Sequence, residues 1–528
     1  MTIPAARLRA DRVDSLFASF DHSHSPGVAV GVAIDGNPVY RKAFGLAQLE
    51  PSTAILPTTR MRIASVTKHF TCLAYLLLCE DGRASIADPL QKHLPELAAT
   101  TYPVTMRQVM AHTSGLRDAC DWFFYDTRKR SSSTDVLRCY QHIADRNAVP
   151  DQSWRYNDGA YLLLGLAIER IYDQPLEEVF RSRIFAPLGM RDTLLSRWDT
   201  QAVPDSADTY IRGSDGVFTR TFRFTEGVGQ GGLLSSIDDM LRWLAHMDTP
   251  VVGTRETWQL IKSPQHLANG TSTGYGFGLI SSRYHDVETL WHSGMVMGGK
   301  SQMLKVPAAN LDIVVIANRH DVSAVELANS VLEACLPGLC KEAVRTATPV
   351  NGTFRSVSSD RLVRLFAKGP LQIVSVDGID LAFSRPTDEA KVLRPVADSA
   401  YRMQSVVLVD SVTNPAEIDF CDYGNSERLI AVSAATPARL GEIPGRFRSG
   451  FAGTEAVISH DRPGLSLRTV GPFGSTEYQL QHLVDQVWRA RGGGAPALGG
   501  ILSFNSTADE FRLTTNANRA VVFSRTVG

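Results

Sequence analysis

Ser65 and Lys68 are spaced so that they could act as a nucleophile and its base. The residues from Arg62 to Phe70 join a polar loop to an apolar run whose spacing predicts a helix that ends at Gly82. Positions i and i+3 of a helix share a face, so the two side chains would lie together. Ser65 would lie in the first turn, where unpaired backbone N–H groups favour a developing anion. A lysine in an apolar surround, which disfavours its charged form, can take the proton of a serine hydroxyl.

The same tetrapeptide also has a purely structural interpretation. S-x-x-K occurs often by chance, because short motifs have a high false-positive rate. Ser65 could cap the helix and Lys68 could lie on its solvated face. The rest of the chain has to decide between the two interpretations.

Three further polar residues lie at predicted helix ends. Asp158 precedes a strongly apolar helix, from Ala160 to Tyr172, and is a good candidate for its N-cap. Tyr156 lies just ahead of that cap, on a loop that the helix start would hold rigidly, and its position alone favours an ordinary packed tyrosine. His112 lies near the end of a short helix predicted within 103–114, where a capping role is favoured over that of a ligand or acid.

The elements that must position these residues include a hairpin and a sheet. Two β-rich runs flank Asp35-Gly36, which is a strong hairpin signal. The stretch from 274 to 317 predicts three consecutive strands of an antiparallel sheet. A helix from Val325 to Cys335 then closes the domain.

The composition changes after about residue 341. Short β-like runs follow, with turn residues roughly every eight to twelve positions, a pattern typical of barrels and sandwiches. Gly352-Thr-Phe-Arg-Ser356 is echoed by Gly445-Arg-Phe-Arg-Ser449, which suggests two similar β domains in tandem. We therefore expect three domains, with boundaries at 1–338, 339–438 and 439–528.

The length, charge and cysteine content of the chain limit the number of domains and the kinds of partner that we expect. A chain of 528 residues is long enough for about three domains. Lys plus Arg number 54 and Asp plus Glu 55, so a net charge of −1 favours neither nucleic acid nor an anionic membrane as a partner. The first twenty residues contain no apolar signal core, and no segment is apolar for the length of a membrane span, so we expect a soluble cytoplasmic protein. Seven scattered cysteines predict free thiols, and we expect neither a metal nor a cofactor.

Five short motifs occur in a characteristic order along the first domain: Ser65-Val-Thr-Lys68, His112-Thr-Ser-Gly115, Pro187-Leu-Gly-Met190, Gly231-Gly-Leu-Leu-Ser235 and His292-Ser-Gly294. With them the chain resembles the serine β-lactamase-like, penicillin-recognising hydrolases over residues 26–338. The two appended β domains resemble, by architecture, the three-domain D-aminopeptidases of that family. The resemblance implies an α+β fold: a β-lactamase-like domain with an antiparallel sheet flanked by helices, followed by two antiparallel β-barrel domains.

The resemblance also implies roles for individual residues. Ser65 would be the nucleophile and Lys68 its activating partner. Tyr156 would be a second general base and the acid that protonates the leaving amine. His292 occupies the first position of an element that is often K-T-G in the family. The backbone N–H groups of Ser65 and of Met295, just past Gly294, would form the oxyanion hole.

The tyrosine motif departs from the family pattern. The family's Y-x-N is Tyr156-Asn157-Asp158 here, so that a carboxylate stands at the third position. Either Asn157 supplies the substrate contact after a small shift, or Asp158 does and the site is more acidic. A cationic substrate amine would suit the second case.

Substrate selection is expected to involve the last domain, because the aminopeptidases of the family shape their site with a loop from it. The candidate is the glycine-rich stretch 489–500, whose glycines reach conformations closed to other residues. This stretch contains no carboxylate for an amine, and a plain surface loop is the alternative. The expected substrate-binding residues of this domain are Asp485, Arg489, Arg491, Gly492, Gly493 and Gly494.

The sequence therefore favours a serine-type D-aminopeptidase or amidase that forms an acyl-enzyme on Ser65. Its substrate would be a small peptide or amide, and a homodimer is possible. An esterase or a D-Ala-D-Ala carboxypeptidase of the same family is the alternative, although the lack of a signal peptide argues against access to periplasmic peptidoglycan. A non-catalytic ligand sensor is more remote, since a sensor has no need of the second base Tyr156.

Overall fold

The structure is a computed structural model. It describes residues 5–99, 103–120, 131–222, 226–285, 287–339, 349–356, 359, 361–369, 371–384, 391–395, 405–410, 415–423, 425–432, 443–451, 453–461, 464–471, 474–492, 500–515 and 517–526.

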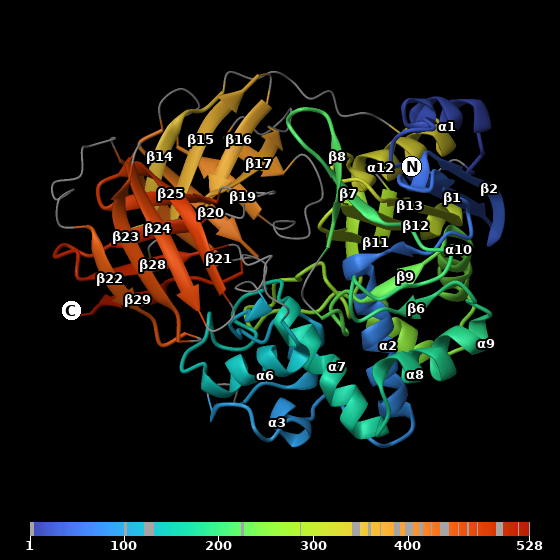
Figure 1. The fold of residues 1–528 in the computed structure, drawn as a ribbon, viewed down its shortest axis with the longest axis horizontal. Coiled ribbons are helices and arrows are strands. Elements are labelled where there is room, and N and C mark those ends of the chain that lie inside the picture. The colour runs from blue at the N-terminus through green and yellow to red at the C-terminus, as the bar shows by residue number, and fades with distance from the viewer. Residues whose placement is uncertain are drawn as a thin grey trace.

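An antiparallel sheet of six strands lies at the centre of the first domain (Figure 1). Its strands, in spatial order, are β10 (Ile280–Tyr284), β11 (Val287–Val296), β12 (Gly299–Val306), β13 (Leu311–Ala317), β1 (Val28–Ile34) and β2 (Asn37–Phe44). The predicted hairpin is confirmed as β1 and β2, and its turn residues Asp35 and Gly36 both have positive φ, as a tight hairpin turn requires. The sequence predicted three strands after residue 274; the structure has four, because the short β10 adds an edge.

Helices cover both faces of this sheet. The covering helices are α1 (Ala10–Phe17), α12 (Ala324–Cys335) and α10 (Ile237–His246). Along β1, Val28, Val30 and Val32 share a core with α1 and α12, whereas Ala29 and Ala33 belong to the core of α10. This alternation is the period of two that places successive side chains of a strand on opposite faces.

The remaining helices form a second layer around α2 (Thr67–Glu80) and α7 (Asp158–Tyr172), which pack on each other. The side chains of α2 are buried on nearly all sides, as expected for a helix in the middle of a large core. The other helices are α3 (Leu90–His93), α4 (Met106–Met110), α6 (Ser133–His142), α8 (Leu176–Phe180), α9 (Ala186–Leu188) and α11 (Arg255–Lys262). Short strands connect the layers: β3 (Leu46–Gln48), β4 (Thr53–Ala54), β5 (Met61–Arg62), β6 (Leu194–Leu195), β7 (Thr209–Arg212), β8 (Phe218–Thr221) and β9 (Leu233–Ser235).

The rest of the chain folds into two closed antiparallel barrels of eight strands each. The first contains β14 (Gly352–Ser356), β15 (Leu362–Lys368), β16 (Leu371–Val376), β17 (Ile379–Ser384), β18 (Val392–Pro395), β19 (Ser405–Val409), β20 (Glu417–Asp422) and β21 (Asn425–Ala431). The second contains β22 (Gly445–Arg448), β23 (Glu455–Asp461), β24 (Gly464–Gly471), β25 (Gly474–Val484), β26 (Val487–Gly492), β27 (Gly500–Phe504), β28 (Glu510–Thr514) and β29 (Val521–Arg525). The predicted fold class is confirmed.

The sequence echo falls on equivalent elements of the two barrels. Its two copies begin the first strands, β14 and β22, which close their barrels by pairing with the last strands, β21 and β29. The expected boundary at 338 falls between α12 and β14, and that at 438 falls between β21 and β22.

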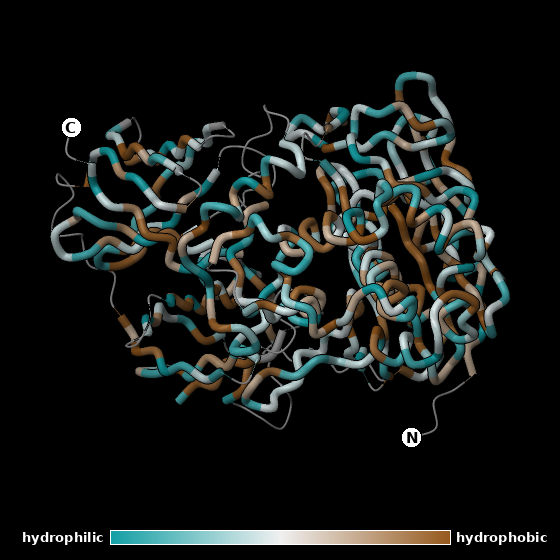
Figure 2. The backbone as a smooth tube through the Cα atoms, turned by 90° about the horizontal axis from the view of Figure 1, so that it is seen from below, coloured by the Kyte–Doolittle hydropathy of each residue, from teal (hydrophilic) through white to brown (hydrophobic). Residues whose placement is uncertain are grey.

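The barrels lie together on one side of the molecule, opposite the sheet and its helices (Figures 1 and 2). Leu362 of the first barrel packs against Val484, Val487 and Ile501 of the second. Among the described residues, no helix combines the length and the apolar character needed to cross a bilayer.

Candidate active site

Ser65 lies in a tight turn between strand β5 and helix α2. The turn is a 3₁₀ helix, Ala64–Val66, so the serine precedes the first turn of the α-helix in which the sequence placed it. Ala64 has φ +49°, a left-handed conformation that costs an alanine on the order of 1–2 kcal/mol. The hydroxyl of Ser301 on β12 donates to the carbonyl of Ile63 at 2.7 Å and fixes the chain ahead of this turn.

Strand β11 passes directly beside the Ser65 turn. A Cβ atom on Gly294 would lie 2.2 Å from the carbonyl oxygen of Ile63 and 2.3 Å from the hydroxyl of Ser301, so only glycine permits this approach. The pairing of β11 with β10 ends at Trp291, and the strand continues past that point to Gly294 and Met295. The two backbones therefore meet where the oxyanion hole was predicted, and the role of the Met295 N–H stays a prediction.

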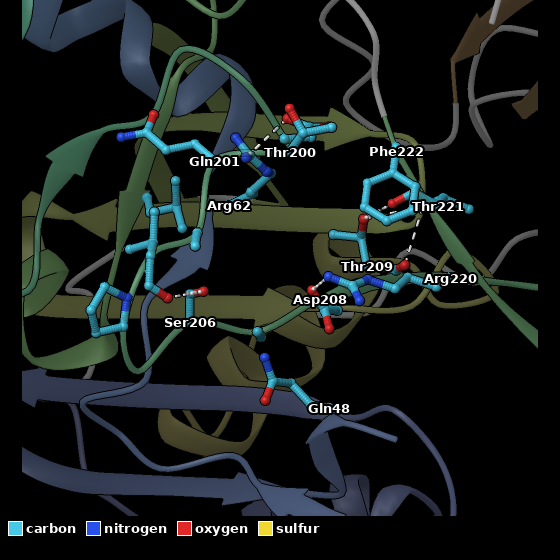
Figure 3. A pocket seen from close by; sticks show the side chains of 16 residues that line it. Gln48, Arg62, Thr200, Gln201, Ser206, Asp208, Thr209, Arg220, Thr221 and Phe222 are labelled. Atoms are coloured by element: carbon cyan, nitrogen blue, oxygen red, sulfur yellow. Dashed lines mark hydrogen bonds and ion pairs between the residues drawn. The ribbon is translucent and has the colours of Figure 1, made fainter. Parts of the chain in front are cut away.

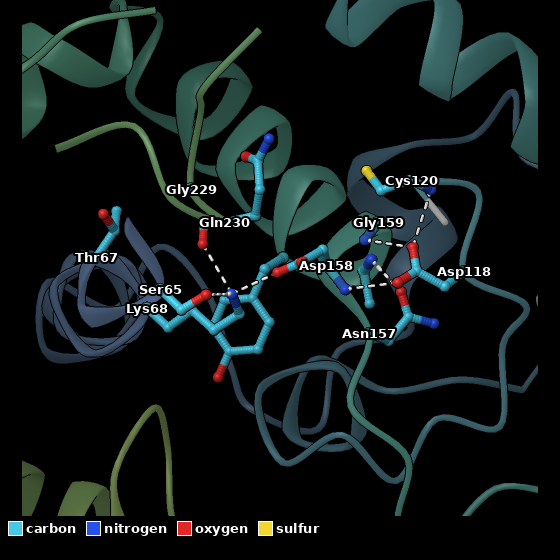
Figure 4. Close-up of polar contacts among 12 residues, drawn as sticks. Ser65, Thr67, Lys68, Asp118, Cys120, Asn157, Asp158, Gly159, Gly229 and Gln230 are labelled. Carbon is cyan, nitrogen blue, oxygen red and sulfur yellow. Dashed lines mark hydrogen bonds and ion pairs between the residues drawn. The ribbon is translucent and has the colours of Figure 1, made fainter. Parts of the chain in front are cut away.

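Lys68 is fully buried and has three acceptors close to its ammonium group (Figure 4). Its Nζ donates to the hydroxyl of Ser65 at 3.2 Å, to the carboxylate of Asp158 at 2.5 Å and to the backbone carbonyl of Gln230 at 2.7 Å. Three acceptors match the three N–H donors of an ammonium. A buried charge needs such a partner, and Asp158 provides it.

Tyr156 packs next to the ammonium group of Lys68. Its ring centroid is 4.7 Å from Nζ of Lys68, and the ring is mostly buried. The ring of His112 packs on it at 4.4 Å and that of His292 lies at 6.2 Å, both measured between centroids. The structure therefore places the ring of Tyr156 beside the ammonium of Lys68, and its role as second general base stays a prediction.

The prediction that Asp158 caps helix α7 is wrong. The N-cap is Asn157, whose side-chain oxygen accepts from the N–H of Ala160 at 2.7 Å. Its amide nitrogen donates to the carbonyls of Leu116 and Arg117, so the Asn157 side chain is engaged within the protein, and a substrate contact from it stays a prediction. Asp158 is the residue of the pair that faces the site.

Asp118 holds the start of helix α7 beside the candidate site, and the sequence analysis missed it. Its carboxylate accepts from the N–H groups of Asp158 at 3.0 Å and of Gly159 at 2.9 Å, which are unsatisfied donors of the first turn of α7. It also accepts from the N–H of Cys120. No local pattern could have revealed this contact, because Asp118 lies 40 residues before the helix N–H group that it accepts from.

The prediction that His112 lies at the closing end of a helix is confirmed. It follows the C-cap Ala111 of α4, and its own N–H donates to the carbonyl of Val109 at 3.3 Å. The N–H of Thr113 donates to the carbonyl of Gln108 at 3.0 Å.

His112 has φ +59° and is buried, and its Nδ1 accepts from the backbone N–H of Asn157 at 3.1 Å. Burial, together with the nearby charge of Lys68, lowers the pKa of His112 well below its usual value. The neutral ring therefore supports the loop that contains Tyr156.

His292 is buried on β11, with both ring nitrogens engaged. Its Nδ1 is 2.6 Å from the carbonyl oxygen of Ser293, which can only accept, and its Nε2 is 3.2 Å from the hydroxyl of Tyr275. Burial, and then the charge of Lys68, lowers the pKa of His292 to about 3. The ring is therefore neutral near pH 7, and a direct catalytic contact of His292 stays a prediction.

Arg489, one of the residues that were expected to bind substrate, lies at the junction of the second barrel with the first. Arg489 donates to the carbonyl of Gly378 at 2.6 Å and forms an ion pair with Asp380 at 3.3 Å. Asp485 lies in the turn between β25 and β26, where its carbonyl accepts from the ring of His482. Strand β26 extends to Gly492, so the first residues of the stretch that was taken for a loop belong to a strand, and a substrate contact from them stays a prediction.

The remaining candidates of that stretch lie near or beyond the end of β26. Arg491 and Gly492 are the last residues of the strand, and Arg491 pairs with Gln479 of β25. Gly493 and Gly494 lie outside the described residues. A contact between this loop and substrate stays a prediction.

A polar cavity of about 520 Å³ lies elsewhere in the first domain (Figure 3). Its two guanidinium groups are compensated, because Arg62 pairs with Asp199 at 2.9 Å and Arg220 pairs with Asp208 at 2.6 Å. None of the residues that line it belongs to the group around Ser65. We therefore assign the chemistry to the Ser65 site.

The family model described as Beta-lactamase matches residues 13–336 of the chain. The match spans more than half of the sequence and coincides with the domain that contains Ser65 and Lys68. The chain belongs to the beta-lactamase family and is a serine hydrolase of that family.

One relative extends the likeness into the barrels. The chain is 27% identical to the D-aminopeptidase of Cereibacter sphaeroides over 475 residues, which cover 88% of this chain and 87% of that protein. Two solved structures share the fold. The octameric penicillin-binding protein homologue from Pyrococcus abyssi has a TM-score of 0.58 at 21% identity. The match covers 80% of this chain and 100% of the homologue's chain. The D-amino acid amidase from Ochrobactrum anthropi SV3 has a TM-score of 0.53 at 22% identity and covers 61% of this chain and 98% of its own.

Proposed function

We propose that this protein releases N-terminal D-amino acids from small peptides or amides through an acyl-enzyme on Ser65. The observation that carries the proposal is the buried Lys68, whose ammonium contacts the hydroxyl of Ser65 and the carboxylate of Asp158 in one network. A purely structural lysine has no need of a serine hydroxyl in a strained turn beside it.

The proposed reaction has two stages. The Ser65 hydroxyl oxygen attacks the carbonyl carbon of the substrate and transfers its proton to the pair formed by Lys68 and Tyr156. The positive charge of Lys68 would stabilise negative charge on the phenol oxygen of Tyr156, which receives this proton and then donates it to the leaving amine. Water then attacks the acyl carbonyl carbon and gives a proton to the same pair, which passes it to the Ser65 oxygen as the ester C–O bond breaks and the acid is released.

Oxyanion stabilisation in this scheme comes from the backbone. The N–H groups of Ser65 and Met295 would donate to the carbonyl oxygen as it becomes negative. The close approach of Gly294 to the carbonyl of Ile63 supports this role, because it fixes β11 against the turn that presents the serine.

The choice of a D-aminopeptidase within the family rests on the relative that spans the barrels. An alignment over 475 residues extends well beyond residues 13–336, so that the D-aminopeptidase of Cereibacter sphaeroides is alike in more than the hydrolase domain. Proteins that share only the first domain give no such support for substrate choice.

A panel of anilides and amides tests the proposal. Purified protein is assayed with D- and L-aminoacyl p-nitroanilides and amides, each with a free and an N-acetylated amine, alongside simple esters and an acyl-D-Ala-D-Ala peptide. We expect turnover of D-substrates with a free amine and loss of that turnover in Ser65→Ala.

Other outcomes of the panel would overturn the substrate assignment. Preferred turnover of simple esters would indicate an esterase, and preferred turnover of the acyl-D-Ala-D-Ala peptide would indicate a carboxypeptidase. Equal turnover of free and N-acetylated D-substrates would remove the case for an aminopeptidase.

A further inference from the structure

Asn518 lies in the turn between β28 and β29 of the second barrel. Its side chain forms two hydrogen bonds with the backbone of Asp118 in the hydrolase domain. Its side-chain oxygen accepts from the backbone N–H of Asp118 at 2.9 Å, and its amide nitrogen donates to the backbone carbonyl of Asp118 at 2.9 Å. The Asn518 side chain is completely buried. Its amide therefore pairs with the backbone of Asp118 as a neighbouring strand would.

Asp118 connects Asn518 to the start of helix α7. Asn518 bonds to the backbone of Asp118, and the carboxylate of Asp118 accepts hydrogen bonds from the N–H groups of Asp158 and Gly159 (Figure 4). A shift of the Asp118 backbone would therefore withdraw the acceptor from two donors of the first helical turn, which is costly for buried N–H groups.

The side chain of Asp158 completes the connection to the reacting group. Its carboxylate is 2.5 Å from Nζ of Lys68, which in turn contacts the hydroxyl of Ser65 at 3.2 Å. Each step from Asn518 to Ser65 is thus a direct hydrogen bond or ion pair, although Asn518 and Asp118 are 400 residues apart in the sequence.

We propose that Asn518 is a positioning residue for Lys68, through which the second barrel holds the catalytic lysine of the first domain. The inference rests on the proposed role of Ser65 as nucleophile. It gives the barrel a part in the rate of acylation in addition to any part in substrate selection.

Docking alone is the competing explanation. Neighbouring residues also join the barrel to the hydrolase domain: the amide nitrogen of Asn147 donates to the carbonyl of Ala517, and its oxygen accepts from the N–H of Arg519. If Asn518 only helped to dock the barrel, its loss would lower stability without acting through Asp158. A double-mutant cycle separates these two roles.

The cycle combines Asn518→Ala with Asp158→Asn in the full chain. The readout is the rate of Ser65 acylation by p-nitrophenyl acetate, a small activated ester that requires no recognition of a D-residue. We expect Asn518→Ala to lower the acylation rate about tenfold, with little change in KM. In the Asp158→Asn background the same substitution should cost less than about twofold, since the carboxylate that it positions is already absent.

Two control variants accompany the cycle. Asn518→Asp keeps an acceptor for the N–H of Asp118 but cannot donate to its carbonyl, and we expect an intermediate rate. Asn425→Ala removes a contact of the first barrel with the carbonyl of Gln152, measured at 3.0 Å, and should leave the acylation rate unchanged.

Hydrogen exchange provides a readout that needs no turnover. The amides of Asp158 and Gly159 should exchange faster in Asn518→Ala than in Asn425→Ala, because their acceptor has moved. Unchanged exchange at these amides, or equal rate losses with and without the Asp158 carboxylate, would overturn the inference. Absence of D-aminopeptidase activity would overturn only the substrate assignment, since neither readout uses a D-substrate.

Discussion

The carboxylate of Asp158 provides a charge that an amide at the same position could not provide. It compensates the ammonium of the fully buried Lys68, which in turn contacts the hydroxyl of Ser65. Because its charge is already matched by Lys68, Asp158 is a poor independent anchor for a cationic substrate amine. Amine recognition is therefore better sought in residues beyond this pair.

His292 provides a prediction at the scale of a single residue. Burial lowers its pKa to about 3 in the folded protein, so the unfolded chain binds a proton more readily, and stability is lost as the pH falls from about 6.5 towards 3. Between pH 7 and pH 5 this histidine should contribute about 2 kcal/mol to the loss. Urea unfolding of His292→Gln should show a correspondingly weaker pH dependence than the wild type.

The exposed His266 supplies the matched control for this measurement. His266→Gln removes a histidine from the surface, and its unfolding curves set the baseline against which His292→Gln is compared. If His292→Gln and His266→Gln gave the same pH dependence, the buried neutral state of His292 would be contradicted.

The sequence could predict which residues of the site are local neighbours. Ser65 and Lys68 are three residues apart, and helical geometry alone brings them together. It could not predict whether Asn157 or Asp158 caps α7, because both residue types are good caps and the choice depends on Asp118, which is distant in sequence. The contact between Asp118 and Asn518 joins residues that are still farther apart in the sequence, and no local sequence pattern predicts it.

At the scale of elements, the site depends on how closely β11 approaches the turn before α2. The strand carries Gly294 past the carbonyl of Ile63 at a separation that leaves no space for a Cβ atom. Strand β12 contributes Ser301, which bonds to the same carbonyl. Two adjacent strands thus hold the turn that contains Ser65 from one side.

Gly294→Ala should misplace β11 relative to Ser65. The added Cβ would meet the carbonyl oxygen of Ile63 at 2.2 Å, so either the strand or the turn must shift. Displacements on the order of 1 Å can cost about 10²-fold in rate, and we expect a loss of kcat/KM of that size. Initial rates measured beside the circular dichroism spectrum would separate this loss from unfolding.

Gly464→Ala is the control for this substitution, since an added Cβ there meets open space in a strand of the second barrel. Its rate should equal that of the wild type. A normal rate in Gly294→Ala would show that the approach of β11 does not position the nucleophile.

At the scale of the whole molecule, both barrels contact the hydrolase domain close to the site. Tyr423 of the first barrel stacks on Trp154, with ring centroids 4.9 Å apart, and Trp154 packs in turn against Tyr156 and His112. The tandem β domains were predictable from spacing and from the Gly352 and Gly445 echo. Their docking was not, because aromatic side chains in a turn give no indication of the surface that they will meet.

Tyr423→Ala should loosen the first barrel from the hydrolase domain. Loss of a buried aromatic side chain typically costs 3–5 kcal/mol, and the exposed face of Trp154 would add to this. We expect a lower thermal midpoint and earlier proteolysis between α12 and β14. Tyr423→Phe keeps the ring on Trp154 and should retain most of the stability; equal losses in the two variants would contradict a role for the stacked ring.

The most direct test of the account is to trap the acyl-enzyme. The protein is quenched with acid during turnover of a D-aminoacyl ester or amide, digested and analysed by mass spectrometry. We predict one adduct, of the mass of the acyl group, on the peptide that contains Ser65. It should be absent in Ser65→Ala, whose turnover should fall by about 10³-fold or more while its circular dichroism spectrum is unchanged. An adduct on another residue, or near-normal turnover in Ser65→Ala, would contradict the assignment of Ser65 as the nucleophile.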